Sequence, residues 1–87
     1  MTFKVVLSAE AQKFYMTAER SVAKKIAKCL LQLEQTPLYH PNIKSLTGKL
    51  AGYYRYRLGD YRVVYAVNEQ SAVVEIVMIA HRKDAYM

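Results

Sequence analysis

Residues 53–67 read YYRYRLGDYRVVYAV, two runs rich in aromatic and β-branched residues that are separated only by Gly59-Asp60. Residues of these types favour β-strands. A glycine at the first position of a two-residue connection is typical of a type II′ hairpin turn. The stretch therefore predicts an antiparallel β-hairpin whose register is set by its turn.

The predicted register brings three arginines onto one face of the hairpin. It places Arg57 directly opposite Arg62, and Arg55 lies two residues before Arg57 on the same strand. Since side chains alternate between the two faces of a strand, all three arginines project from one face. The opposite, core-facing side carries Tyr54, Tyr56, Leu58, Tyr61, Val63 and Tyr65.

The three arginines predict a binding site for an anion. Like charges directly opposite each other destabilise a sheet, and a ligand with several oxygen atoms would relieve that repulsion. The planar guanidinium group suits phosphate in particular. A purely structural explanation stays open from the sequence: solvated arginines protect edge strands, and Glu75 could pair with Arg57 or Arg62 on the same face.

Regular patterns also cover the chain before the hairpin. Residues 3–7 form a short apolar run that predicts a strand, and Ser8 after it is a good helix N-cap. Apolar residues at helical spacing predict two helices, at residues 9–18 and 19–35. The polar segment at residues 38–50 is interpreted as a loop.

One more strand follows the hairpin and completes the predicted fold. Residues 68–71 predict a turn, and residues 72–80 are apolar on both faces apart from Glu75, so we expect a strand buried on both sides. The order β-α-α-β-β-β predicts an α+β fold. We expect a single domain at residues 1–87, with two N-terminal helices packed on a small, mainly antiparallel sheet.

The composition excludes several classes of protein. The 87 residues include 13 Lys and Arg against 7 Asp and Glu, a net charge of +6, and 53% hydrophobic residues. A chain this hydrophobic is not a disordered basic tail. Because the chain has a single cysteine, disulfide-rich folds and four-ligand zinc modules are excluded. This residue, Cys29, falls on the apolar stripe of the second predicted helix. No segment suits a bilayer. We expect a cytoplasmic protein with no membrane contact, metal or cofactor, which binds nucleic acid or an acidic protein.

The C-terminal stretch adds chemistry to the arginines. Residues 79–86 read IAHRKDAY and contribute His81, Arg82 and Tyr86, while Lys44 and Lys49 extend the basic surface. A cluster so rich in arginine and so poor in carboxylates is unsuited to Mg²⁺. It fits metal-free RNA cleavage, in which the ribose 2′-hydroxyl attacks the neighbouring phosphate and the enzyme neutralises the extra negative charge.

Over essentially its whole length, the chain resembles the RelE/ParE superfamily of bacterial toxins. The likeness rests on the predicted element order, the hairpin at residues 53–65 and the ending at residues 81–86. It implies a RelE-like toxin, a ribosome-dependent endoribonuclease that cuts mRNA. It also implies a cognate antitoxin as partner, RelB-like or another small antitoxin, and contact with operator DNA through the antitoxin complex. ParE-like members share the fold but inhibit DNA gyrase without cleaving RNA.

The resemblance also implies roles for individual residues. Arg62 and Arg82 would stabilise the scissile phosphate, and Tyr86 would stack on or orient a base. Arg55 and Arg57 fall where RelE has two lysines, and a guanidinium group is a poor proton acceptor. Imidazole titrates near neutral pH, so His81 is the better residue to move a proton, and Glu75 is a weaker choice. The expected catalytic residues are thus Arg62, Arg82, His81 and Tyr86, and the expected RNA-binding residues are Arg55, Arg57, Lys44 and Lys49.

Two other functions stay open on the sequence. The chain could be a ParE-like gyrase inhibitor, although a pure gyrase binder would not need the basic, His and Tyr set at the C-terminus. It could also be an inactive member that only binds an antitoxin and co-represses an operon. Cleaved transcripts in cells would favour the nuclease, whereas DNA damage with intact mRNA would favour the gyrase inhibitor.

Overall fold

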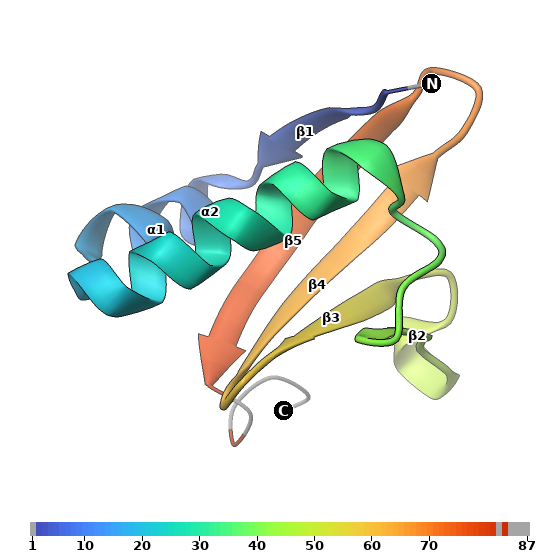
Figure 1. The fold of residues 1–87 in the computed structure, drawn as a ribbon. Helices are drawn as coiled ribbons and strands as arrows, with labels where there is room; N and C mark the ends of the chain where they lie inside the picture. Colours follow the sequence, from blue (N-terminus) through green and yellow to red (C-terminus); the bar gives the residue numbers. More distant parts are fainter. Residues whose placement is uncertain (1, 82, 84–87) are drawn as a thin grey trace.

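A single mixed sheet is the framework of the protein in a computed structural model that describes residues 2–81 and 83. Its strand order is β1-β5-β4-β3-β2 (Figure 1). Strand β1 runs parallel to β5, and every other neighbouring pair is antiparallel. The strands are β1 (Lys4–Leu7), β2 (Ile43–Ser45), β3 (Tyr54–Leu58), β4 (Tyr61–Asn68) and β5 (Val73–His81).

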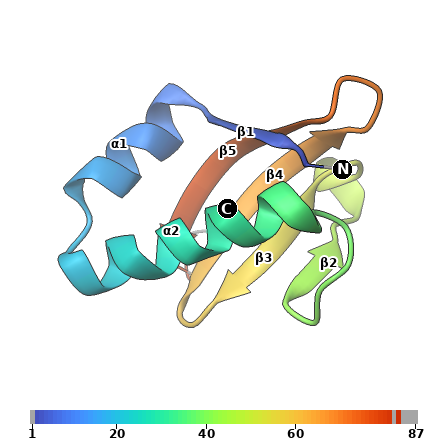
Figure 2. The same ribbon diagram turned by 45° about the horizontal axis from the view of Figure 1, so that its top comes forward.

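Two helices, α1 (Ala9–Thr17) and α2 (Arg20–Gln35), cover one face of this sheet (Figures 1 and 2). Helix α1 begins as predicted, since the Ser8 side-chain oxygen accepts a hydrogen bond from the Ala11 backbone N–H at 3.1 Å. The core lies between the helices and the sheet. Its fully buried members include Ala11, Ile26, Cys29, Leu33, Val63, Tyr65, Val74 and Ile76.

The predicted hairpin register is confirmed. Arg57 pairs with Arg62, and Arg55 pairs with Val64. Gly59 has a φ of 62°, whereas Asp60 is not among the residues with positive φ. A positive φ at only the first turn residue matches the predicted type II′ turn. The tyrosines of β3 and β4 pack on the helix side, as expected, so the arginines lie on the other face.

Two predictions about strands are wrong. Residues 38–50 are not all loop, because Ile43–Ser45 form β2 at the edge of the sheet and Gly48–Leu50 form a 3₁₀ turn. A three-residue strand is too short to show a periodic pattern. Strand β5 is also not buried on both sides, because its buried residues, Val74, Ile76 and Ile79, all belong to the core beneath the helices. A bulge between Val64 and Tyr65 of β4 interrupts the pairing with β5. The extra residue shifts the alternation of faces by one position, so that beyond the bulge Ile79 and not Met78 belongs to the buried core.

None of the described helices has the length and apolarity needed to cross a membrane.

Candidate phosphate-binding site

The sheet face opposite the helices carries the three predicted arginines. The Arg57 backbone N–H donates to the Asn42 carbonyl on the β2 side, at 2.8 Å. It therefore points away from β4, and Arg57 and Arg62 form a non-hydrogen-bonded pair, the closer kind, with Cα atoms about 4.5 Å apart. Two side chains of like charge therefore start from the closest cross-strand positions that an antiparallel sheet offers.

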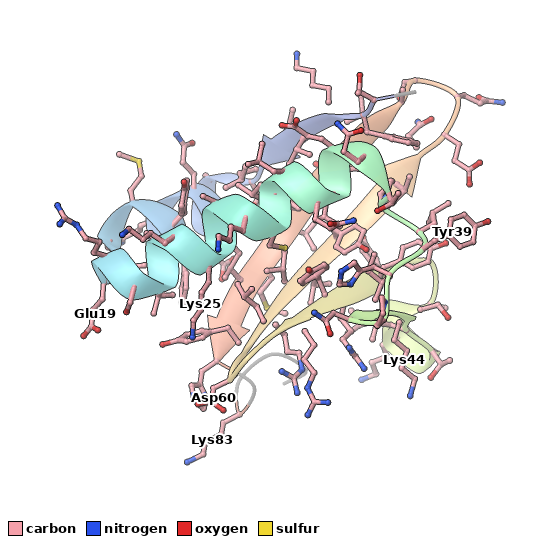
Figure 3. All side chains as sticks on the ribbon, viewed as in Figure 1. Glu19, Lys25, Tyr39, Lys44, Asp60 and Lys83 are labelled. Carbon is pink, nitrogen blue, oxygen red and sulfur yellow. The ribbon has the colours of Figure 1, made fainter. Side chains whose placement is uncertain are left out.

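A groove on this face gathers three cationic side chains. Its volume is about 450 Å³, and its lining residues are Lys44, Ser45, Leu46, Thr47, Arg55 and Arg62. Strand β2 brings Lys44 directly opposite Arg55, and the Lys44 side chain points away from the helices (Figure 3). The lining contains no carboxylate, so the groove suits a polyanion and not a metal cation.

Backbone carbonyls hold two of the arginines in place. Nη1 of Arg62 donates to the carbonyls of Gly59 at 3.2 Å and Tyr61 at 3.0 Å. Nη1 of Arg55 donates to the Asn42 carbonyl at 2.9 Å. Both arginines are half-buried. A guanidinium has five N–H donors in a planar fork, so donors on its other nitrogens are left for a phosphate.

Lys49 and Arg57 lie beside the groove and do not line it. Lys49 belongs to the 3₁₀ turn and lines a second hollow of about 330 Å³, which shares Leu46 and Thr47 with the groove. Arg57 is exposed on the same sheet face as Arg62. Both cations therefore extend the basic surface beyond the groove.

His81 does not join the arginines, contrary to the prediction that the two groups converge. It pairs with Tyr61, whereas the residue opposite Arg62 is Ala80. The rings of His81 and Tyr61 meet edge to face with centroids 5.5 Å apart, and Tyr61 packs in the same way on Phe14 of α1 at 5.9 Å. The alternation of side chains along β5 therefore places His81 on the helix side of the sheet.

Glu75 is also remote from the arginines. It pairs with Ala66, while Ala80 is the β5 residue opposite Arg62. Five residues of extended strand separate Glu75 from Ala80, a distance of about 16 Å. The suggested pairing of Glu75 with Arg57 or Arg62 is therefore wrong, and the repulsion between the arginines is not relieved by this carboxylate.

Some predicted residues lie outside the part of the chain that the structure describes. These are Arg82 and Tyr86. Within the described part, no three His, Cys, Asp or Glu side chains gather as metal ligands would. Cys29 is confirmed as a core residue, 1% exposed, and burial raises the pKa of its thiol to about 12. Such a thiol stays protonated and is a poor nucleophile.

The sequence interpretation missed the turn before β2. The carbonyl of His40 accepts a hydrogen bond from the Ile43 N–H at 2.9 Å, which closes a turn around Pro41 and Asn42. Proline in the second position is a known signal for such a turn. That signal could have located the turn, but the contact between Asn42 and Arg55 depends on the short strand β2, which the sequence did not reveal.

Comparisons with known proteins agree with this fold. The protein-family model described as "ParE toxin of type II toxin-antitoxin system, parDE" matches residues 5–86. The chain is 40% identical over 65 residues to Toxin RelE of Mycobacterium tuberculosis, and this match covers 71% of this chain and 67% of that protein.

Solved structures show the same architecture. The toxin–antitoxin complex RelBE2 from Mycobacterium tuberculosis contains a chain that superposes with a TM-score of 0.83 at 23% identity, covering 94% of this chain and 100% of that one. The archaeal RelE–RelB complex from Pyrococcus horikoshii gives a TM-score of 0.82 at 29% identity, covering 98% of this chain and 100% of that one.

Proposed function

Because the chain belongs to the RelE/ParE superfamily of toxins of type II toxin–antitoxin systems, we propose that it is a RelE-like endoribonuclease. It cleaves mRNA on the ribosome without a metal ion and so inhibits translation. The observation that carries the proposal is the groove in which Lys44, Arg55 and Arg62 meet with no carboxylate in the lining.

The reaction follows from what such a groove can stabilise. The 2′-oxygen of a ribose attacks the adjacent phosphorus and loses its proton. The bond from phosphorus to the 5′-oxygen breaks, and that oxygen gains a proton. The pentacoordinate transition state carries extra negative charge, which positioned cations stabilise without reorganising. Arg62, fixed by two backbone carbonyls, supplies a positive charge that stabilises this transition state. Arg55 and Lys44 hold the RNA backbone.

Other residues complete the proposed site. Arg57 and Lys49, which lie beside the groove, contact the RNA beyond it. Arg82 acts as the second phosphate-stabilising arginine and Tyr86 orients a base, both on the strength of the family resemblance. His81 faces Tyr61 on the helix side, so we do not assign it the proton transfer at the groove.

The proposed partners follow from the same family. Relatives of known structure form complexes of RelE with RelB, and we infer a cognate antitoxin for this chain, RelB-like or of another small family. The toxin–antitoxin complex would reach operator DNA through the antitoxin. Ribosomes and mRNA are the proposed targets, which places the toxin in the cytoplasm.

A ParE-like inhibitor of DNA gyrase is the second candidate function. It is favoured by the family model, which is described as a ParE toxin, whereas the curated relative is a RelE toxin. The two candidates make opposite demands on the groove. A nuclease needs its arginines for the chemical step, whereas a gyrase binder needs only a surface that fits its target.

Primer extension on mRNA from cells that express the toxin tests the proposal. We expect transcripts cut within translated regions, and we expect Arg62→Ala to lower the cleavage rate by about 100-fold or more because its charge acts in the transition state. Arg20→Ala is the matched control, since Arg20 is exposed at the start of α2 and its loss should leave cleavage unchanged. Intact mRNA together with inhibited supercoiling by purified gyrase would instead establish the ParE-like function.

A further inference from the structure

The turn that leads into β2 is held by the side chain of its own first residue. Nδ1 of His40 accepts a hydrogen bond from the Asn42 backbone N–H at 3.1 Å. The His40 carbonyl accepts a second bond from the Ile43 N–H at 2.9 Å. Asparagine and aspartate side chains make the same contact, to the N–H two residues on, in Asx turns. The first bond holds the Pro41–Asn42 peptide, and the second holds the Asn42–Ile43 peptide, which carries the Asn42 carbonyl. The side chain and the carbonyl of His40 thus together set the direction of the Asn42 carbonyl.

The ring of His40 also fixes the turn to the core. It lies 5.2 Å, centroid to centroid, from the ring of Tyr56, with an angle of 30° between the planes. Tyr56 is 7% exposed and belongs to the buried cluster under the helices. The imidazole therefore links the core residue Tyr56 on β3 to the turn that precedes β2.

On the sheet face opposite Tyr56, the same turn contacts a residue of the groove. The Asn42 carbonyl accepts from the Arg57 backbone N–H at 2.8 Å and from Nη1 of Arg55 at 2.9 Å. Arg55 shares the groove with Lys44 and Arg62. Like charges would drive a free arginine side chain out of this groove, so its bond to the carbonyl keeps the guanidinium there before any ligand arrives.

We propose that His40 is a positioning residue for Arg55: its Nδ1 holds the Asn42 N–H and with it the turn that presents the Asn42 carbonyl, and this carbonyl holds the guanidinium in the groove. This inference rests on the proposed function, because it assumes that Arg55 binds the RNA backbone. Holding the side chain in advance removes the entropy cost of ordering it when RNA binds. His40 therefore contributes to affinity without touching RNA.

Three variants separate the ring of His40 from its hydrogen-bond acceptor. His40→Phe keeps an aromatic ring against Tyr56 and loses the acceptor. His40→Asn keeps an acceptor suited to the N–H two residues on and loses the ring. His40→Ala loses both. The assay is single-turnover cleavage of mRNA on purified ribosomes at increasing toxin concentration, which gives a half-saturating concentration and a maximal rate.

We expect His40→Phe and His40→Ala to raise the half-saturating toxin concentration about fivefold, the size typical of coupled neighbours. The maximal rate should change less than twofold. His40→Asn should restore most of the affinity. Equal losses for His40→Phe and His40→Asn, or a normal half-saturating concentration for His40→Phe, would overturn the inference. Binding of the cognate antitoxin and the thermal unfolding midpoint show whether each variant is folded.

A double-mutant cycle with Arg55 distinguishes this inference from the proposed function. In an Arg55→Ala background, His40→Phe should have no further effect, since there is no guanidinium to position. A full additional loss there would assign His40 a role apart from Arg55 and refute the positioning. If Arg55→Ala itself leaves cleavage unchanged, the proposed role of Arg55 in RNA binding fails first.

A measurement on the free protein keeps the inference testable if a variant is too unstable to assay. In ¹⁵N NMR spectra, the tethered guanidinium of Arg55 should give slowly exchanging Nη signals in the unsubstituted protein. In His40→Asn these signals should persist. Their absence from the unsubstituted protein, or their loss in His40→Asn, would contradict the tether.

Discussion

Arg57 and Arg62 form the closest kind of cross-strand pair with the same charge, so each should lower the stability of the free toxin. We predict that Arg57→Gln raises the free energy of unfolding by about 0.5 kcal/mol at low salt, because it removes this repulsion. The gain should shrink at high salt, where exposed charges are screened. Urea unfolding at two salt concentrations measures both effects.

The matched control for this residue pair is Lys4→Gln. Lys4 is exposed on β1, at the opposite edge of the sheet from β2, and pairs with an uncharged residue, Val73. Lys4→Gln removes one positive charge, as Arg57→Gln does, but it relieves no cross-strand repulsion. Equal stabilisation by the two substitutions would mean that net charge, and not the arginine pair, governs stability. A fall in stability for Arg57→Gln would show that the pair is not repulsive.

The hairpin is the element that sets the geometry of the site, and its turn depends on one glycine. Gly59 has a φ of 62°, and a Cβ atom there would meet only Nζ of Lys25, at an ordinary contact distance of 3.9 Å. Backbone strain is therefore the cost of a side chain at this position. We predict that Gly59→Ala lowers the free energy of unfolding by about 1–2 kcal/mol. Asp60→Ala, in the same turn without a positive φ, should change it much less, and thermal unfolding compares the two.

The same element explains how much could be predicted from the sequence. The two-residue turn between Leu58 and Tyr61 leaves one register, so the pairing of Arg57 with Arg62 and the face of all three arginines followed from counting residues. The helices followed from their apolar spacing and from Ser8. These features are local, and local patterns are what a sequence displays directly.

The remaining features depend on contacts between distant segments. Strand β2 has three residues and exists through its pairing with β3, so Lys44 could not be assigned a partner from its own neighbours. The bulge in the pairing of β4 with β5 decides which residues of β5 face the helices. The bulge turns His81, the last residue of that strand, toward the helix side. Because the apolar run gave no sign of the bulge, the predicted convergence of His81 with the arginines was wrong.

At the scale of the whole molecule, the sheet separates two functions. One face packs against both helices and forms the core, and the other carries the groove with Lys44, Arg55 and Arg62. The net charge of +6 includes exposed lysines on α2, among them Lys28. If RNA binds at the groove, the cations on the two sides of the molecule must contribute unequally to binding, although each adds one positive charge.

Salt dependence measures that inequality. The affinity for a short RNA that is 2′-O-methylated, and so cannot be cleaved, falls as salt rises because phosphate contacts release counterions. We predict that Lys44→Gln makes the slope of log affinity against log salt less steep by about 0.7, the value for one contact with a single strand. Lys28→Gln should leave the slope unchanged, since α2 covers the opposite face of the sheet. Equal changes in the two variants would mean that RNA is attracted by net charge alone, and a change in Lys28→Gln only would move the binding surface to the helices.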